Sequence, residues 1–184
     1  TKQLSYIIDG LDFSEFSVSI ITLSKENNQS LKSEFSDYPI EYYCLNSRSS
    51  SNPFRVYLSL QKLVNQLQLD VLHSQGIRAD MCCAFLRKIP RISSQRNNPF
   101  EEYPALYGQF KGYLMARLHV FALRRIDQVV TCSKTLSLED KKFRIPATYI
   151  RNGIPILSER SGPAELSSTS APKFFIQPHI NFYF

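Results

Sequence analysis

The sequence predicts an α/β protein built on an open, doubly wound parallel sheet. The first observation is that short apolar segments alternate with helical segments from residue 1 to residue 153. The second is that the linking segments are long enough for crossover helices, which parallel strands require. The third is the composition, since 43% hydrophobic and 21% charged residues are typical of a globular domain. Right-handed crossovers then favour a single sheet.

The first third of the chain predicts one helix and two strands. Apolar residues recur at helical spacing in residues 1–12, and residues 16–23 form the apolar run of a buried strand. Residues 24–37 are polar and hold at most a short helix. Residues 39–46 predict the second strand, and the Ser-rich residues 47–53 predict a loop.

The middle of the chain alternates helix and strand. Residues 54–68 place apolar side chains mostly on one side, and Pro53 suits the first turn of that helix. A strand is expected at residues 70–74. The helix at residues 76–88 stops at Pro90, because proline cannot continue a helix.

The later elements complete the sheet. Residues 97–108 are rich in Asn, Pro and aromatic residues and predict a loop. The long helix from about residue 106 to residue 126 is apolar all round, so we expect it to be buried on more than one side. A last helix is expected at residues 134–143. The remaining strands are predicted at residues 91–95, 128–133 and 147–153.

Positive charge is concentrated in one part of the chain. The net charge is +6, and residues 87–125 hold eight basic residues against two acidic ones. Such a block indicates an anionic partner: a phosphate, a nucleic acid or an acidic membrane surface. A solvated helix surface explains it equally well.

Several functional classes are excluded by missing signatures. The chain has no glycine-rich dinucleotide or phosphate loop, no H-E-x-x-H zinc motif, no G-x-S-x-G elbow and no D-x-D pair. The histidines are scattered, so no metal site is expected. No apolar run approaches the roughly 20 residues that span a bilayer, and the N-terminus lacks a signal-peptide layout. The cysteines lack a C-x-x-C pair, and together these observations predict a cytoplasmic protein with buried thiols. The cysteines are Cys44, Cys82, Cys83 and Cys132.

Three ordered motifs resemble the N-terminal domain of family 4 retaining glycosyltransferases, which consist of two facing Rossmann-like domains (the GT-B architecture). The first is an aspartate-led strand ending in histidine, Asp70 to His73. The second is the strand VVTCSK entering a helix, Val129 to Lys134. The third is RNGI, Arg151 to Ile154, where the chain leaves the domain. The resemblance covers residues 1–154.

The resemblance also implies what surrounds this domain in the family. Relatives begin with a strand and a glycine-rich loop before the first helix, whereas Thr1 already falls in that helix. Residues 155–184 are expected to be a linker and an orphan tail strand. The second domain, which binds the nucleotide-sugar in this family, is expected to be absent. On this interpretation the chain looks truncated at both ends and is expected to be inactive alone.

The predicted cleft lies where neighbouring strands end, because open α/β sheets bind ligands at that edge. His73, Ser74, Gln75 and Gly76 follow one strand. His73 either contacts a substrate or is a structural histidine bonded to a nearby loop. Relatives often carry a second histidine at the position of Gln75.

The next strand leads into Arg96, Asn97 and Asn98, near the position where many relatives carry a histidine. Arg96 offers a fork of donors suited to phosphate. It either holds an anionic acceptor or pairs with Glu101 or Glu102.

Two further pairs complete the candidate site. Ser133 and Lys134 begin a helix after a strand, so backbone N–H groups there can bind an anion, although Ser133 can equally be an N-cap. Asn152 and Gly153 are expected to form a turn at the domain exit.

The leading hypothesis is the acceptor-side domain of an enzyme that transfers sugar from a nucleotide-sugar to a glycan or lipid-linked acceptor, in polysaccharide or cell-envelope glycan synthesis. This enzyme is expected to need no cofactor or metal, because the nucleotide-sugar is a co-substrate. No nucleic-acid partner is expected. Contact of its basic helix residues with the inner face of an anionic membrane is compatible with it. The alternatives are a basic module that binds a phosphorylated ligand or nucleic acid, supported by Phe100, Tyr103 and Tyr107 beside Arg96, or an inactive truncated product.

Overall fold

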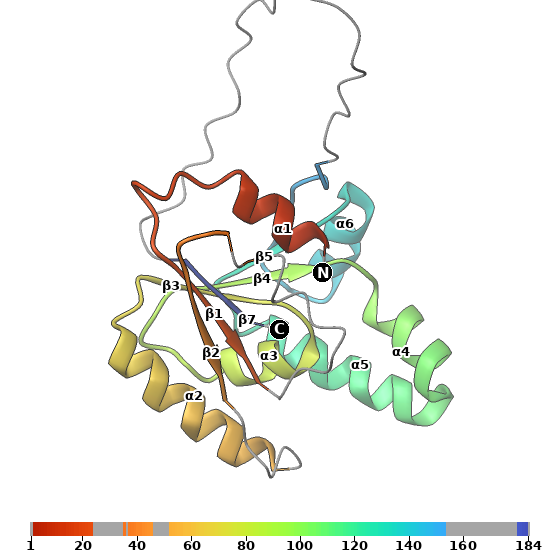
Figure 1. Cartoon of the computed structure of the whole chain (residues 1–184). Coiled ribbons are helices and arrows are strands. Elements are labelled where there is room, and N and C mark those ends of the chain that lie inside the picture. Colours follow the sequence, from red (N-terminus) through yellow and green to blue (C-terminus); the bar gives the residue numbers. More distant parts are fainter. Residues whose placement is uncertain (1, 24–34, 36, 46–51, 154–179, 184) are drawn as a thin grey trace, which may run out of the picture.

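The computed structural model describes residues 2–23, 35, 37–45, 52–153 and 180–183 (Figure 1). These residues form one parallel sheet with the strand order β2-β1-β7-β3-β4-β5-β6, which confirms the predicted fold class. The strands are β1 (Val18–Thr22), β2 (Ile40–Cys44), β3 (Val71–Ser74), β4 (Arg91–Gln95), β5 (Gln128–Thr131), β6 (Ala147–Tyr149) and β7 (Ile180–Tyr183). The helices are α1 (Lys2–Asp9), α2 (Pro53–Leu67), α3 (Ile77–Cys83), α4 (Pro99–Tyr107), α5 (Gln109–Leu123) and α6 (Lys134–Lys142).

Apolar layers cover both faces of the sheet. Strand side chains alternate between the faces, so Leu72 packs with α2 and α3 while Val71 packs with α1 on the opposite side. A third cluster joins α5 to β5 and β6 through Leu123, Val129 and Ala147. Figure 1 shows α2, α3 and α5 on one side of the sheet and α1 on the other.

The predicted start of α2 is confirmed. The side chain of Asn52 accepts hydrogen bonds from the backbone N–H groups of Phe54 and Arg55, and Pro53 occupies the first turn. The helix ends at Gln68, which has a left-handed backbone conformation.

The expectation of a loop at residues 97–108 is wrong, because residues 99–107 form α4. The Asn98 side chain accepts from the Phe100 N–H at 3.0 Å, and Pro99 stands in the first turn, where proline is tolerated. Pro104 lies inside this helix but removes a single N–H donor. Gly108, with φ +82, then separates α4 from α5, so the long helix begins at Gln109 and not near residue 106.

Helices α4 and α5 pack closely because of one glycine. A Cβ atom on Gly112 would lie 2.3 Å from the carbonyl oxygen of Tyr103 and 2.4 Å from the nitrogen of Pro104. Any larger residue would force the two helices apart.

The expectation that α5 is buried on more than one side is also wrong. One side packs on the domain through Gly112, Ala116, His119 and Leu123. The other side leaves large apolar side chains exposed, with Phe110 at 89%. The sequence pattern is apolar on both sides, but the described part of the chain covers only one of them.

The expected orphan strand in the tail is a paired strand of the sheet. β7 lies between β1 and β3 and is parallel to both, with Ile180 aligned with Val18 on one side and Val71 on the other. Local pattern cannot show this pairing, because the partners lie more than a hundred residues away in the sequence. The division into residues 1–154 and 155–184 stays a prediction. In the described part of the chain, no helix is long and apolar enough to cross a membrane.

Candidate functional site

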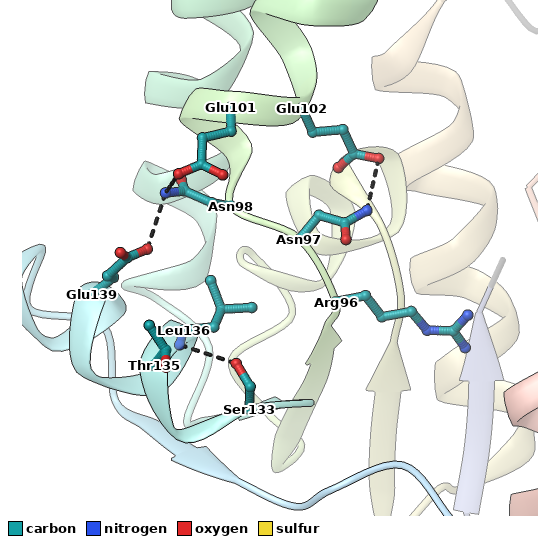
Figure 2. A pocket seen from close by; sticks show the side chains of 9 residues that line it. All are labelled: Arg96, Asn97, Asn98, Glu101, Glu102, Ser133, Thr135, Leu136 and Glu139. Atoms are coloured by element: carbon teal, nitrogen blue, oxygen red, sulfur yellow. Dashed lines mark hydrogen bonds between the residues drawn. The ribbon is translucent and has the colours of Figure 1, made fainter. Parts of the chain in front are cut away.

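An open hollow of about 560 Å³ lies where β4 and β5 end and the helices after them begin. This is the edge at which doubly wound sheets bind ligands. Its side chains come from the β4–α4 connection, the first turn of α4 and the first turns of α6 (Figure 2). The lining residues are Arg96, Asn97, Asn98, Glu101, Glu102, Ser133, Thr135, Leu136 and Glu139.

Two capped helix starts shape the hollow. Asn98 caps α4, as described above, and the Ser133 hydroxyl accepts from the Leu136 N–H at 3.2 Å at the start of α6. Ser133 is therefore an N-cap, one of the two roles that the sequence left open. Its side chain nevertheless faces the hollow.

Amide and carboxylate side chains form a hydrogen-bonded frame around the hollow. Asn97 donates to Glu102 at 3.2 Å, and Asn98 donates to Glu101 at 3.3 Å and to Glu139 at 3.1 Å. The last contact joins α4 to α6 (Figure 2). Each carboxylate keeps acceptor capacity, since an ionised carboxylate has about four lone-pair sites. The frame thus presents several acceptors to a ligand with hydroxyl donors.

Arg96 extends away from Glu101 and Glu139 (Figure 2). It lies against Gln75, whose amide oxygen, when oriented toward it, accepts from both Nε and Nη2 at 2.9 Å. The proposed partners Glu101 and Glu102 are instead bonded to the asparagines. Partial burial lowers the pKa of Arg96, but the guanidinium stays charged at neutral pH.

His73 lies one strand away from Arg96. Its Nε2 is 2.7 Å from the Ser94 hydroxyl on β4, so the ring bridges neighbouring strands. Burial lowers the pKa of His73 to about 4, and the Asp80 carboxylate offsets only part of that effect. His73 is therefore neutral at pH 7 and does not line the hollow.

Ser74 points into the domain and belongs to a buried network. Its hydroxyl donates to Asp80 at 2.5 Å, and the other oxygen of Asp80 lies 2.7 Å from Nε2 of His119. Nδ1 of His119 is 2.8 Å from the Tyr103 hydroxyl. A proton on Nε2 lets His119 donate to Asp80 and accept from Tyr103, so this network connects β3, α3, α4 and α5.

The other predicted residues lie outside the lining of the hollow. Gly76 precedes α3 with φ +88, a conformation that favours glycine. Lys134 is exposed at the start of α6, and Asn152 and Gly153 are exposed beyond β6. Cys82 and Cys83 are buried as expected. Cys44 is exposed and Cys132 is half-buried, which corrects the expectation for these two thiols.

The sequence reasoning missed five lining residues: Glu101, Glu102, Thr135, Leu136 and Glu139. For α4 a signal was present, because Asn98-Pro99 followed by two glutamates is a helix start. The aromatic residues of this segment are largely used in packing. Tyr103 is buried, and Phe100 stacks on Phe143 with ring centroids 5.0 Å apart.

Asp140 lies behind the hollow on the inner side of α6. Gln95 donates to one of its oxygens at 3.4 Å, and the other oxygen has no partner within the described residues. Burial raises the pKa of Asp140 to about 6. Among the described residues, no three His, Cys, Asp or Glu side chains gather as a metal site.

The comparisons with known proteins agree with this architecture. The sequence profile of Glycosyltransferase Family 4 matches residues 3–156, which is most of the chain. No curated protein matches the chain.

Proposed function

The chain belongs to glycosyltransferase family 4, and we propose that it forms the acceptor side of a transferase. The reaction is transfer of a sugar from a nucleotide-sugar to a glycan or lipid-linked acceptor, in polysaccharide or cell-envelope glycan synthesis. The observation that carries the proposal is the amide–carboxylate frame of Asn97, Asn98 and Glu102 at the carboxyl edge of the sheet.

The chemistry of the hollow suits a sugar acceptor. Carboxylate oxygens accept from hydroxyl groups, and the N–H groups of Asn97 and Asn98 donate to them. Holding an acceptor hydroxyl in a fixed position lowers the barrier by proximity and orientation. Arg96 at the rim, held by Gln75, suits an anionic group next to the sugar, such as the phosphate of a lipid-linked acceptor.

The donor is assigned to another part of the enzyme. Glu101, Glu102 and Glu139 line the hollow, and like charges this close would repel the diphosphate of a nucleotide-sugar. We therefore propose that the donor binds outside this hollow. We also propose that residues 1–184 transfer no sugar by themselves. We propose that the reaction needs no metal, since the sequence has no D-x-D pair. We also propose that it is cytoplasmic, since the described cysteines are free thiols.

Ligand-observed NMR with a panel of monosaccharides and oligosaccharides tests the acceptor site. At least one saccharide should show saturation transfer from the purified chain. Asn97→Ala should weaken it, because the substitution removes a donor and releases Glu102. Asn65→Ala, on the exposed side of α2, is the matched control and should bind like the wild type. Equal binding by both variants, or no binding by any saccharide, would overturn the proposal.

A further inference from the structure

The outward side of α5 combines exposed apolar and basic side chains in one surface. Counting along a helix of 3.6 residues per turn places Phe110, Leu114, Leu118 and Phe121 in one stripe. They are 89%, 53%, 45% and 41% exposed. Lys111 and Arg117 flank the stripe, and Arg124 and Arg125 follow the last residue of the helix. Together these eight residues are called the outer α5 surface.

This surface carries no opposing charge of its own. From Gln109 to Arg125 the sequence has no Asp or Glu. The cations also lie over aromatic rings, with Arg125 3.7 Å from the Phe121 ring centroid and Arg117 5.8 Å from that of Tyr113. Cations flanking an apolar stripe match an anionic lipid surface, where headgroups meet the charges and acyl chains meet the apolar residues.

We propose that the outer α5 surface docks the protein on an anionic lipid bilayer. The helix has 15 residues, hence a length of about 22 Å, so it lies in the interface and does not span it. The second apolar side of α5, which the other described residues leave exposed, is then covered by lipid. A second copy of the chain is a poorer occupant, because a two-fold contact through this surface would bring two sets of cations together.

The docking surface and the hollow share one helix. Glu101 and Glu102 lie in the first turn of α4 and line the hollow, while Leu106 and Tyr107 in its last turn are 65% and 49% exposed beside α5. Lys111 of α5 lies over the Tyr107 ring at 5.7 Å. Glu101 and Leu106 are only about 8 Å apart along the axis of α4. Docking therefore holds the hollow near the lipid headgroups. The role of docking in presenting an acceptor to the hollow rests on the proposed function, whereas the binding of the bilayer does not.

Co-sedimentation with vesicles tests the inference. The chain should bind vesicles of phosphatidylcholine mixed with phosphatidylglycerol and not vesicles of phosphatidylcholine alone. The double variant F110S/L114S should bind at least about tenfold more weakly, because it removes two inserting side chains. F54S/L138S is the matched control, since it removes the same residue types from exposed positions on α2 and α6, and it should bind like the wild type.

A second pair of variants tests the charges. K111Q/R117Q should weaken binding about twenty-five-fold at low salt, at about fivefold for each cation removed. K141Q/K142Q removes the same charge from the exposed end of α6 and should have little effect. All four variants are exposed substitutions, and circular dichroism will show that they fold.

Three outcomes would overturn the inference. The first is that the wild type does not bind anionic vesicles. The second is that the test and control variants lose vesicle binding equally. The third is that the chain self-associates, that F110S/L114S abolishes this self-association, and that vesicles do not bind. Failure of vesicle binding while Asn97→Ala still weakens saccharide binding would refute docking alone. Vesicle binding without any saccharide binding would refute the proposed function alone.

Discussion

Arg96 lies against Gln75, whose amide oxygen, with the amide oriented to accept, is 2.9 Å from both Nε and Nη2 of the guanidinium. The sequence departs at both places from the family that it resembles, since many relatives carry a histidine at the position of Gln75 and another near that of Arg96. The departures are thus in contact, one at the end of β3 and the other at the end of β4. We interpret them as one unit in which Gln75 orients Arg96.

The two residues should therefore behave as a coupled pair. With glucose 1-phosphate as a probe, Gln75→Ala and Arg96→Lys should each weaken binding, because lysine cannot make the two-pronged contact. The double variant should lose less than the sum of the two, by about 1 kcal/mol. Isothermal titration calorimetry of the four proteins gives this coupling. Additive losses would show that the residues act independently.

Gly112→Ala should destabilise the domain by about 2 kcal/mol or more, because its Cβ would lie 2.3 Å from the Tyr103 carbonyl oxygen. Gly153→Ala is the control, since nothing lies within 4 Å of its Cβ position and its φ is not in the left-handed region. Urea unfolding monitored by circular dichroism compares the two. A Gly112→Ala midpoint equal to that of the wild type would contradict the close approach of α4 and α5.

Asp80→Ala should cost about 3 kcal/mol of unfolding free energy, because it leaves His119 and Ser74 buried without their shared partner. Glu15→Ala removes an exposed carboxylate and should leave stability nearly unchanged. Chemical denaturation measures both. A small effect at Asp80 would show that the network contributes little to docking α5 on α3.

Asp140→Asn should stabilise the protein at neutral pH. The native pKa of Asp140 is about 6 against an ordinary 3.8, so the native state binds more protons than the unfolded state between these values. The contribution of Asp140 to the free energy of unfolding therefore falls as the pH rises from about 4 to 6, by about 3 kcal/mol in all. The variant should exceed the wild type above pH 6 and match it below pH 4 in thermal unfolding.

The contribution of His73 to stability changes with pH in the opposite direction to that of Asp140. Its native pKa of about 4 lies below the ordinary 6.5, so the unfolded state binds the extra proton between these values. Its contribution to stability rises with pH over this window. His73→Gln should remove that rise, and the same thermal unfolding series will show it. A pH dependence unchanged in both variants would contradict the burial of these two groups.

Asn181→Pro should destabilise the sheet, because β7 pairs on both sides and proline has no N–H to donate. A loss of about 3 kcal/mol is expected from the missing bond and the steric conflict. Asn181→Ala keeps the backbone donor and serves as the control. Hydrogen exchange of the β1 and β3 amides reports the result, and unchanged protection in Asn181→Pro would show that β7 does not pair there.

Local pattern was sufficient for most of the fold and for part of the site. The alternation of apolar and helical periods predicted β1 to β6, and Pro53 marked the start of α2. Arg96, Asn97, Asn98 and Ser133 were predicted because each follows a strand, and parallel strands end at one edge. The missed α4 had a local signal as well, in Asn98-Pro99, but its two prolines and aromatic residues favoured a loop.

The sequence by itself determined the α/β order and the strand ends, because periodicity and capping act within a few residues of one another. Only the tertiary structure decided the contacts between distant segments. It paired β7 with β1 and β3, joined Asp80 to His119, brought Gln75 to Arg96 and left one side of α5 exposed. Each of these features depends on how elements pack in space. An apolar helix side has the same sequence pattern whether it is covered by the rest of the protein or by another partner.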